Sequence, residues 1–223
     1  QLALKLARED KIVIAYDAFQ TIYEVEPPTA ASLFGSDDNG NPIVTFDEDI
    51  ILHKCYRNPL EILVASHAIG FGIYSSKIVQ MLESKEHWED LGYVVETGEF
   101  KSGNPTSIMR PPENSPSSIS QNQTIDQLLT IETFNGLQLE TDWVVNNIVE
   151  TIKKQGVDAE DILVISADDR NSAGYFRAIS QKLLLQNIRC NNMQESSYSV
   201  RDFQNRGEVT LSTVYKAKGN EAY

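Results

Sequence analysis

Long apolar runs, cysteines and basic clusters are all scarce in this sequence of 223 residues. No apolar run approaches the roughly 20 residues of a membrane-spanning helix, and the start has no basic region followed by an apolar core. We therefore expect neither a signal peptide nor a transmembrane helix, and a cytoplasmic location. Cys55 and Cys190 lack the spacing of metal ligands, which favours a pair of reduced thiols.

Positive charge is also scarce, since 19 Lys and Arg stand against 32 Asp and Glu for a net charge of -13. Phosphate binding depends on clustered Lys and Arg, so this balance argues against a surface that wraps nucleic acid nonspecifically, although it permits local basic stripes. The commoner use of such an excess is a solubilising face. The hydrophobic fraction of 41% is that of an ordinary globular protein, with room for one large domain or one domain plus a fragment.

Side chains with catalytic potential are scattered rather than grouped. His67 falls in a largely apolar helical segment, where a hydrogen-bonded core histidine is a better interpretation than a metal ligand. Asp168 and Asp169 follow a predicted strand, and a solvated helix start explains them better than acid–base catalysis. The sequence therefore predicts no metal site.

The stretch from 50 to 74 combines an apolar run at 50–52, a polar turn and an apolar helix that includes Leu60 and Phe71. We expect 50–52 to form a strand, which places Tyr56 and Arg57 at a strand-to-helix junction. In open α/β sheets, ligands bind at such junctions. An exposed aromatic ring beside an arginine suits stacking on a base and contact with a phosphate. A half-buried Tyr56 beside a charge-neutralising Arg57 remains the plainer alternative.

Elsewhere, periodicity and turn residues indicate an α/β protein, because strands and helices alternate regularly in the second half. Asn39 and Gly40 are expected to close a small hairpin within a linker, and Asn171 to cap a helix that carries Phe176, Ile179, Leu183 and Leu184. Residues 111–123 are predicted to be a mobile loop. We expect further strands at 11–15, 93–100, 106–110, 128–134, 162–166, 188–190 and 209–214, and helices at 77–92 and 139–155.

Three segments that each follow a predicted strand resemble motifs of the UvrD/Rep-like superfamily 1 helicases. KIVIAYDAFQTIY at 11–23 resembles motif III, CYRN at 55–58 resembles motif IV, and TLSTVYKAKGNE at 210–221 resembles motif V. The third is the most specific because its spacing is long, and all three occur in the order of the family.

The resemblance implies a RecA-like fold, in which helices flank a parallel sheet. It also implies that the chain contains parts of two such domains. Residues 1–25 would be the tail of the first RecA-like domain, 26–49 a linker, and 50–223 the second domain (2A), with a small β-containing insertion around 93–123. The sequence has no G-x-x-x-x-G-K-[ST] and no D-E-x-Q, so this chain alone should not hydrolyse ATP. We expect it to be a piece of a longer protein, whose N-terminal RecA-like domain shares ATP and Mg²⁺ with it.

The resemblance also assigns roles at the nucleotide. Gln20 would sense the γ-phosphate and Arg57 would act as an arginine finger, which together are the predicted catalytic residues. Tyr56 would stack on the adenine, Glu221 would contact the ribose, and Gly219 belongs to the turn that couples nucleotide to nucleic acid. Such a guanidinium would stabilise charge on the transferring phosphoryl group.

The same resemblance implies single-stranded DNA, or alternatively RNA, as a partner. The predicted nucleic-acid-binding residues are Tyr23, Thr213, Tyr215, Lys216 and Lys218.

Three departures from the family favour a second hypothesis. Val25 and Glu26 stand where the family often has an aromatic residue and then Arg, and Tyr215 replaces the usual His. These changes remove a stacking platform and an imidazole. They fit a nucleotide-regulated interaction module with weakened nucleic-acid binding. A third hypothesis, a generic α/β domain with accidental motif matches, also stays open.

Overall fold

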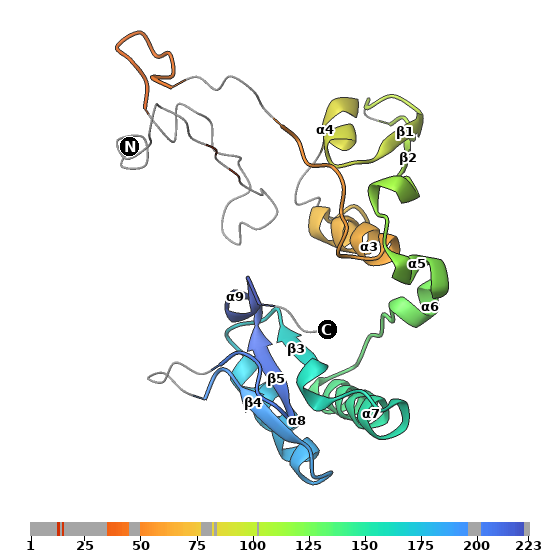
Figure 1. Ribbon diagram of the computed structural model, residues 1–223, viewed down its shortest axis with the longest axis vertical. Helices are drawn as coiled ribbons and strands as arrows, with labels where there is room; N and C mark the ends of the chain where they lie inside the picture. The colour runs from red at the N-terminus through yellow and green to blue at the C-terminus, as the bar shows by residue number, and fades with distance from the viewer. Residues whose placement is uncertain are drawn as a thin grey trace. The chain divides into compact units, whose positions relative to one another are not determined.

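The structure is a computed structural model that describes residues 13, 15, 35–44, 50–76, 82, 84–101, 103–195 and 202–220. The chain divides into two compact units, residues 1–131 and 132–223 (Figure 1). Within the described residues, no helix has both the length and the apolar character needed to cross a membrane. Gln20, Tyr23, Glu221 and most of the strand predicted at 11–15 lie outside the described residues.

The C-terminal unit is built around an all-parallel sheet of three strands in the order β3-β5-β4. This confirms the predicted α/β class and the strands expected near 162–166, 188–190 and 209–214. The elements are α7 (Leu137–Gln155), η4 (Ala159–Asp161), β3 (Leu163–Ser166), α8 (Ser172–Leu184), β4 (Arg189–Asn192), β5 (Glu208–Thr213) and α9 (Val214–Ala217).

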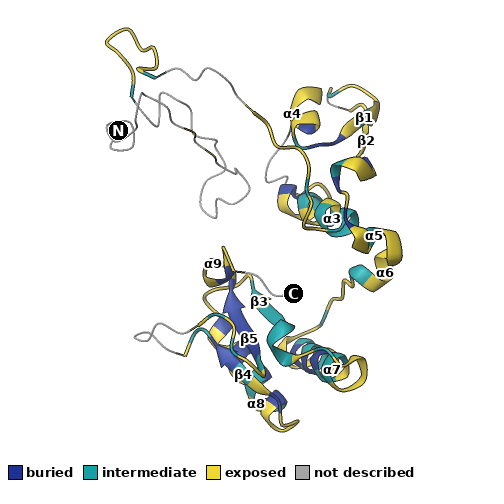
Figure 2. Cartoon of the chain, viewed as in Figure 1, coloured by how far each residue is buried: buried dark blue, intermediate teal, exposed yellow. Residues whose placement is uncertain are grey.

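Both long helices of this unit pack on one face of the sheet. Val209 and Leu211 of the central strand are fully buried against Ile148 of α7 and Phe176 of α8. Figure 2 shows that β5 is buried along nearly its whole length. Leu184 is 65% exposed, because its neighbour Leu183 faces the core and successive helical residues point about 100° apart.

On the opposite face of the sheet, β4 and β5 carry polar side chains and are crossed by the segment before β5. The Thr210 hydroxyl donates to the Phe203 carbonyl at 3.0 Å, and the Asn191 amide donates to the carbonyls of Asp202 and Phe203. These bonds satisfy backbone carbonyls of an irregular segment. They also fix the chain that leads into the central strand.

The N-terminal unit contains short elements around an aromatic core. Its β1 and β2 pair antiparallel, as predicted for 93–100 and 106–110, and a bridge between Ser36 and Pro42 closes the hairpin predicted at Asn39 and Gly40. The described elements are α3 (Leu60–Phe71), α4 (Lys85–Asp90), β1 (Val94–Thr97), β2 (Ser107–Met109), η3 (Pro112–Asn114), α5 (Ser118–Asn122) and α6 (Ile125–Leu128).

The aromatic core joins α3, α4 and β1. Phe71, Trp88 and Tyr93 are buried, and the Phe71–Trp88 and Trp88–Tyr93 ring pairs meet edge to face. The Nδ1 atom of His67 lies 2.8 Å from the Tyr93 hydroxyl oxygen, so the prediction of a hydrogen-bonded core histidine is confirmed. Burial raises the pKa of Tyr93 to about 12, which keeps its hydroxyl protonated at neutral pH.

A buried arginine, Arg110, ties this core to the segment before α3. Its guanidinium donates to the carbonyls of His53, Leu91 and Asn114 and, at 2.7 Å, to the Ser115 hydroxyl. The strand predicted at 50–52 is wrong, since a strand needs a hydrogen-bonded partner. The His53 carbonyl is used by a side chain, and 50–55 has no partner strand among the described residues.

Two further predictions about this unit are wrong. The loop predicted at 111–123 contains η3 and α5, because Pro112 starts one helical turn and the Ser117 hydroxyl caps the other. The strand predicted at 128–134 overlaps the end of α6, which a capping box between Thr124 and Gln127 begins. The helix predicted at 77–92 shortens to α4, and 77–81 lie outside the described residues.

Gly92 lies so close to His53 and Arg110 that there is no space for a side chain. Its φ is 87°, and a Cβ atom there would lie 2.4 Å from the His53 carbonyl oxygen and 2.8 Å from the Arg110 guanidinium. We expect Gly92→Ala to cost about 2–4 kcal/mol of unfolding free energy, because the change adds both backbone strain and displacement of Arg110.

Urea unfolding followed by Trp88 fluorescence, in a Trp143→Phe background, measures this loss. Gly103→Ala is the matched control, since Gly103 has a φ of 85° and open space around it. It should cost only about 1 kcal/mol of backbone strain. Equal losses in the two variants would contradict the steric explanation.

Candidate functional site

The three strands of the C-terminal unit end at the same edge of their sheet, and the predicted motif V lies there. Ser166 ends β3, Asn192 ends β4 and Thr213 ends β5, and all strands run in one direction. The loops that follow such strands form the usual ligand-binding edge of a parallel sheet. The candidate site is therefore built from these three loops.

The segment after β5 folds as a single turn of helix that begins directly at the strand end. Thr213 is the N-cap residue of α9, it is fully buried, and its Oγ1 has no hydrogen-bond partner among the described residues. Tyr215, Lys216 and Lys218 are all exposed. The turn ends at Gly219, whose φ of 83° lies in the left-handed region that suits glycine.

Thr213, Tyr215, Lys216, Lys218 and Gly219 are thus brought together within one short turn. Asn220 closes it, since its backbone N–H donates to the Ala217 carbonyl at 2.9 Å and its amide to the Lys216 carbonyl at 3.1 Å. Exposed ammonium groups on such a turn are able to contact phosphate groups. The remaining predicted contacts, Tyr23 and Glu221, lie outside the described residues.

The loop after β3 is an exposed turn that leads into α8 and is held by the Asp168 carboxylate. The Asp168 carboxylate accepts bonds from the Asn171 side chain and from the backbone N–H groups of Arg170 and Asn171. These bonds, the Asn171 side chain first, lower the pKa of Asp168 below its ordinary value. Asn171 occupies the N-cap position of α8, as predicted, but its side chain makes no capping hydrogen bond and donates to Asp168 instead.

The loop after β4 was not singled out from the sequence and proves to connect the other two. Gln194 reaches Ser172 at the start of α8, and the Lys216 ammonium donates to the Met193 carbonyl at 2.5 Å. The sequence signal was weak, since an Asn-Asn pair after a short strand resembles an ordinary turn.

The other predicted residues, Tyr56 and Arg57, lie in the N-terminal unit, directly before α3. Tyr56 is 71% exposed and Arg57 is exposed as well, so a half-buried Tyr56 is ruled out. Their segment is held at both ends, because the Cys55 N–H donates to the Asn114 carbonyl at 2.9 Å and the Leu60 N–H to the Ser120 hydroxyl at 3.0 Å. Both side chains therefore project from an anchored turn.

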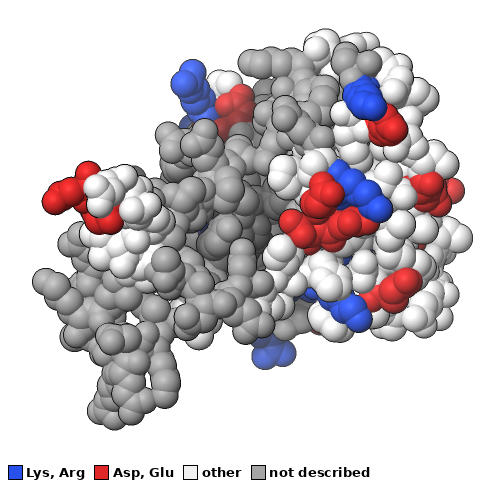
Figure 3. Space-filling view, turned by 90° about the horizontal axis from the view of Figure 1, so that it is seen from above, with Lys and Arg blue, Asp and Glu red and all other residues white. Residues whose placement is uncertain are grey.

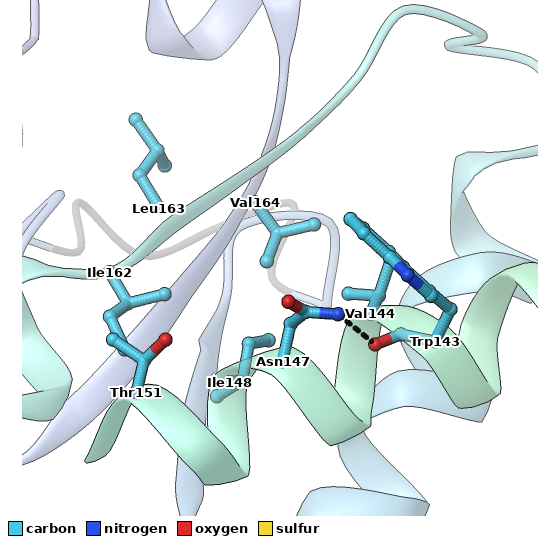
Figure 4. Close-up of a pocket in the computed structure, with 8 residues that line it drawn as sticks. All are labelled: Trp143, Val144, Asn147, Ile148, Thr151, Ile162, Leu163 and Val164. Atoms are coloured by element: carbon cyan, nitrogen blue, oxygen red, sulfur yellow. Dashed lines mark hydrogen bonds between the residues drawn. The ribbon is translucent and has the colours of Figure 1, made fainter. Parts of the chain in front are cut away.

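The remaining candidate is a shallow apolar groove of about 240 Å³ between α7 and β3 (Figure 4). The Asn147 amide in it is used internally, since it donates to the Trp143 carbonyl at 3.0 Å. Among the described residues, no cluster of His, Cys, Asp and Glu has the geometry of a metal site. The groove is lined by Trp143, Val144, Asn147, Ile148, Thr151, Ile162, Leu163 and Val164.

Comparison of the chain with protein-family models, with curated proteins and with solved structures finds no match.

Proposed function

We propose that the chain is the C-terminal motor portion of an ATP-dependent superfamily 1 DNA helicase or translocase, with a RecA-like second domain. The carrying observation is the position of TLSTVYKAKGNE, which spans the carboxyl end of the central strand in an all-parallel sheet. Ligands bind at strand ends of this kind. A short turn at such an end suits a segment that contacts both the nucleotide and the nucleic acid. Helices on one face of the sheet are compatible with the proposed fold.

The nucleotide half of the proposal concerns Tyr56 and Arg57. Both are exposed on an anchored turn, which suits a ring that stacks on adenine and a guanidinium that reaches across to a γ-phosphate. The upstream RecA-like domain would supply the P-loop and hold most of the ATP and Mg²⁺. Gln20, Gly219 and Glu221 would complete the site.

The DNA half is supported by how charge is divided along the chain. Residues 1–131 contain 19 acids and 9 Lys or Arg, a net charge of -10, whereas residues 132–223 contain 13 acids and 10 Lys or Arg, a net charge of -3. Between residues 209 and 220 the only charged side chains are Lys216 and Lys218. Most of the excess negative charge therefore lies in the N-terminal unit. It argues less strongly against nucleic-acid binding by the C-terminal unit, which contains the proposed motif V.

A nucleotide-regulated interaction module remains the second candidate. Val25, Glu26 and Tyr215 favour it, together with the acidity of the N-terminal unit. On the face shown in Figure 3, Lys and Arg lie in small groups mixed with Asp and Glu, and the described residues visible there form no continuous basic stripe. Such a module would bind nucleotide and a protein partner while contacting DNA weakly.

Binding of a fluorescent single-stranded oligonucleotide to the full-length protein separates the two candidates. A translocase should bind with an affinity that depends on ATP and falls steeply with salt, because phosphate contacts release counterions. If the protein is a translocase, the double variant Lys216→Met/Lys218→Met should bind the oligonucleotide about tenfold more weakly or worse.

The matched control is Lys153→Met/Lys154→Met, which removes the same charge from the exposed end of α7. Equal weakening by the two double variants would mean that only net charge matters. Absence of ATP-dependent binding at moderate salt would favour the interaction module.

A further inference from the structure

We infer that Gln194 and Lys216 are positioning residues that clamp the turn after β4 between α8 and motif V, and that Lys218 is the motif V lysine that contacts phosphate. The clamp stands on the contacts alone, whereas the phosphate contact rests on the proposed function. The turn comprises residues 192–195 and is called the β4 turn below.

The β4 turn has a defined backbone of its own. The Met193 N–H donates to the Leu211 carbonyl of β5 at 3.0 Å, and the Gln194 N–H donates to the Asn192 side chain at 3.0 Å. The Glu195 N–H donates to the Asn192 carbonyl at 3.2 Å. Asn192 is only 4% exposed, so the turn is rooted in the sheet.

Two side-chain contacts join this turn to its neighbours. On one side, the Gln194 amide lies 3.0 Å from the buried Ser172 hydroxyl and 3.4 Å from an Asp169 carboxylate oxygen. On the other side, the Lys216 ammonium donates to the Met193 carbonyl at 2.5 Å. The three loops at the edge of the sheet are thereby linked in series, from the start of α8 through the β4 turn to α9.

These contacts give the two lysines of the proposed motif V different roles. Lys216 already uses its ammonium to hold a backbone carbonyl, so its position is fixed by the protein. Lys218 follows two residues later and is exposed, and its side chain makes no hydrogen bond or ion pair in the part of the chain that the structure describes. Its ammonium is therefore available to a phosphate, whereas movement of Lys216 to a phosphate would break one of the contacts that hold the β4 turn.

Hydrogen exchange of the 223-residue chain tests the clamp without nucleic acid. Lys216→Met and Gln194→Leu should each raise exchange of the amides in the β4 turn by about tenfold, which corresponds to one lost hydrogen bond of about 1.4 kcal/mol. Lys218→Met, with the same loss of charge, should leave it unchanged. Unchanged exchange in Lys216→Met, or an equal rise in Lys218→Met, would overturn the clamp.

The salt dependence of single-stranded DNA binding by the full-length protein tests the assignment of the lysines. Lys218→Met should make the slope of log K against log salt shallower by about 0.7, the value for one phosphate contact on a single strand. Lys216→Met should weaken binding with the slope unchanged. Equal slope changes would overturn the assignment. If the parent protein binds no DNA, the proposed function and the lysine assignment fail together, and the exchange experiment still decides the clamp.

Discussion

Arg57→Ala in the full-length protein should lower nucleic-acid-stimulated ATP hydrolysis by about 10³-fold or more, the usual contribution of an arginine finger. The reason is chemical, since negative charge spreads over the equatorial oxygens of the transferring phosphoryl group and a guanidinium can pair with it in two places. Because Arg57 is exposed on a turn anchored through Cys55 and Leu60, its removal should leave the fold intact.

The measurement is the steady-state rate with saturating ATP and single-stranded DNA, and circular dichroism checks the fold. Lys54→Ala is the matched control, because Lys54 is an exposed cation in the same segment and should lose little activity. Arg57→Lys should remain strongly impaired, since an ammonium lacks the planar fork. Turnover at the parent rate in Arg57→Ala would refute the role of Arg57 at the nucleotide.

Elements with a strong apolar period could be predicted from the sequence. The helix predicted at 139–155 is α7, the strand predicted at 162–166 contains β3, and Gly156 ends α7 in the left-handed conformation with a φ of 74°. These predictions succeeded because each element buries a continuous apolar stripe or run, and because glycine suits a helix C-terminus.

The failures came where tertiary contacts determine the backbone. The apolar run at 50–52 reads as a strand, but a strand needs a partner, and the guanidinium of a residue more than fifty positions away takes the His53 carbonyl. Likewise, the exposed lysines Lys216 and Lys218 look equivalent in sequence. Only the contact between Lys216 and Met193 distinguishes them.

Arg110→Met should be the most destabilising single substitution in the N-terminal unit, with a loss of about 3–5 kcal/mol of unfolding free energy. Arg110 is 4% exposed, and its guanidinium also lies over the Tyr93 ring, 5.5 Å from the ring centroid. Burial lowers the pKa of Arg110 from its ordinary value, yet so basic a group keeps its charge at neutral pH. Within the described residues no carboxylate pairs with it, so backbone carbonyls carry its stabilisation.

Removal of the guanidinium leaves the carbonyls of His53 and Leu91 without a donor, whereas the Asn114 carbonyl keeps the Cys55 N–H, and the segment before α3 loses one of its anchors. Urea unfolding followed by Trp88 fluorescence in the Trp143→Phe background measures the loss, and Lys101→Met, which removes an exposed cation, should change stability by less than about 1 kcal/mol. Arg110→Lys decides between charge and geometry. A lysine cannot span the carbonyls of His53 and Leu91 together with the Ser115 hydroxyl, so it should recover little of the loss. Full recovery by lysine would mean that the buried charge, rather than the planar fork, organises this unit.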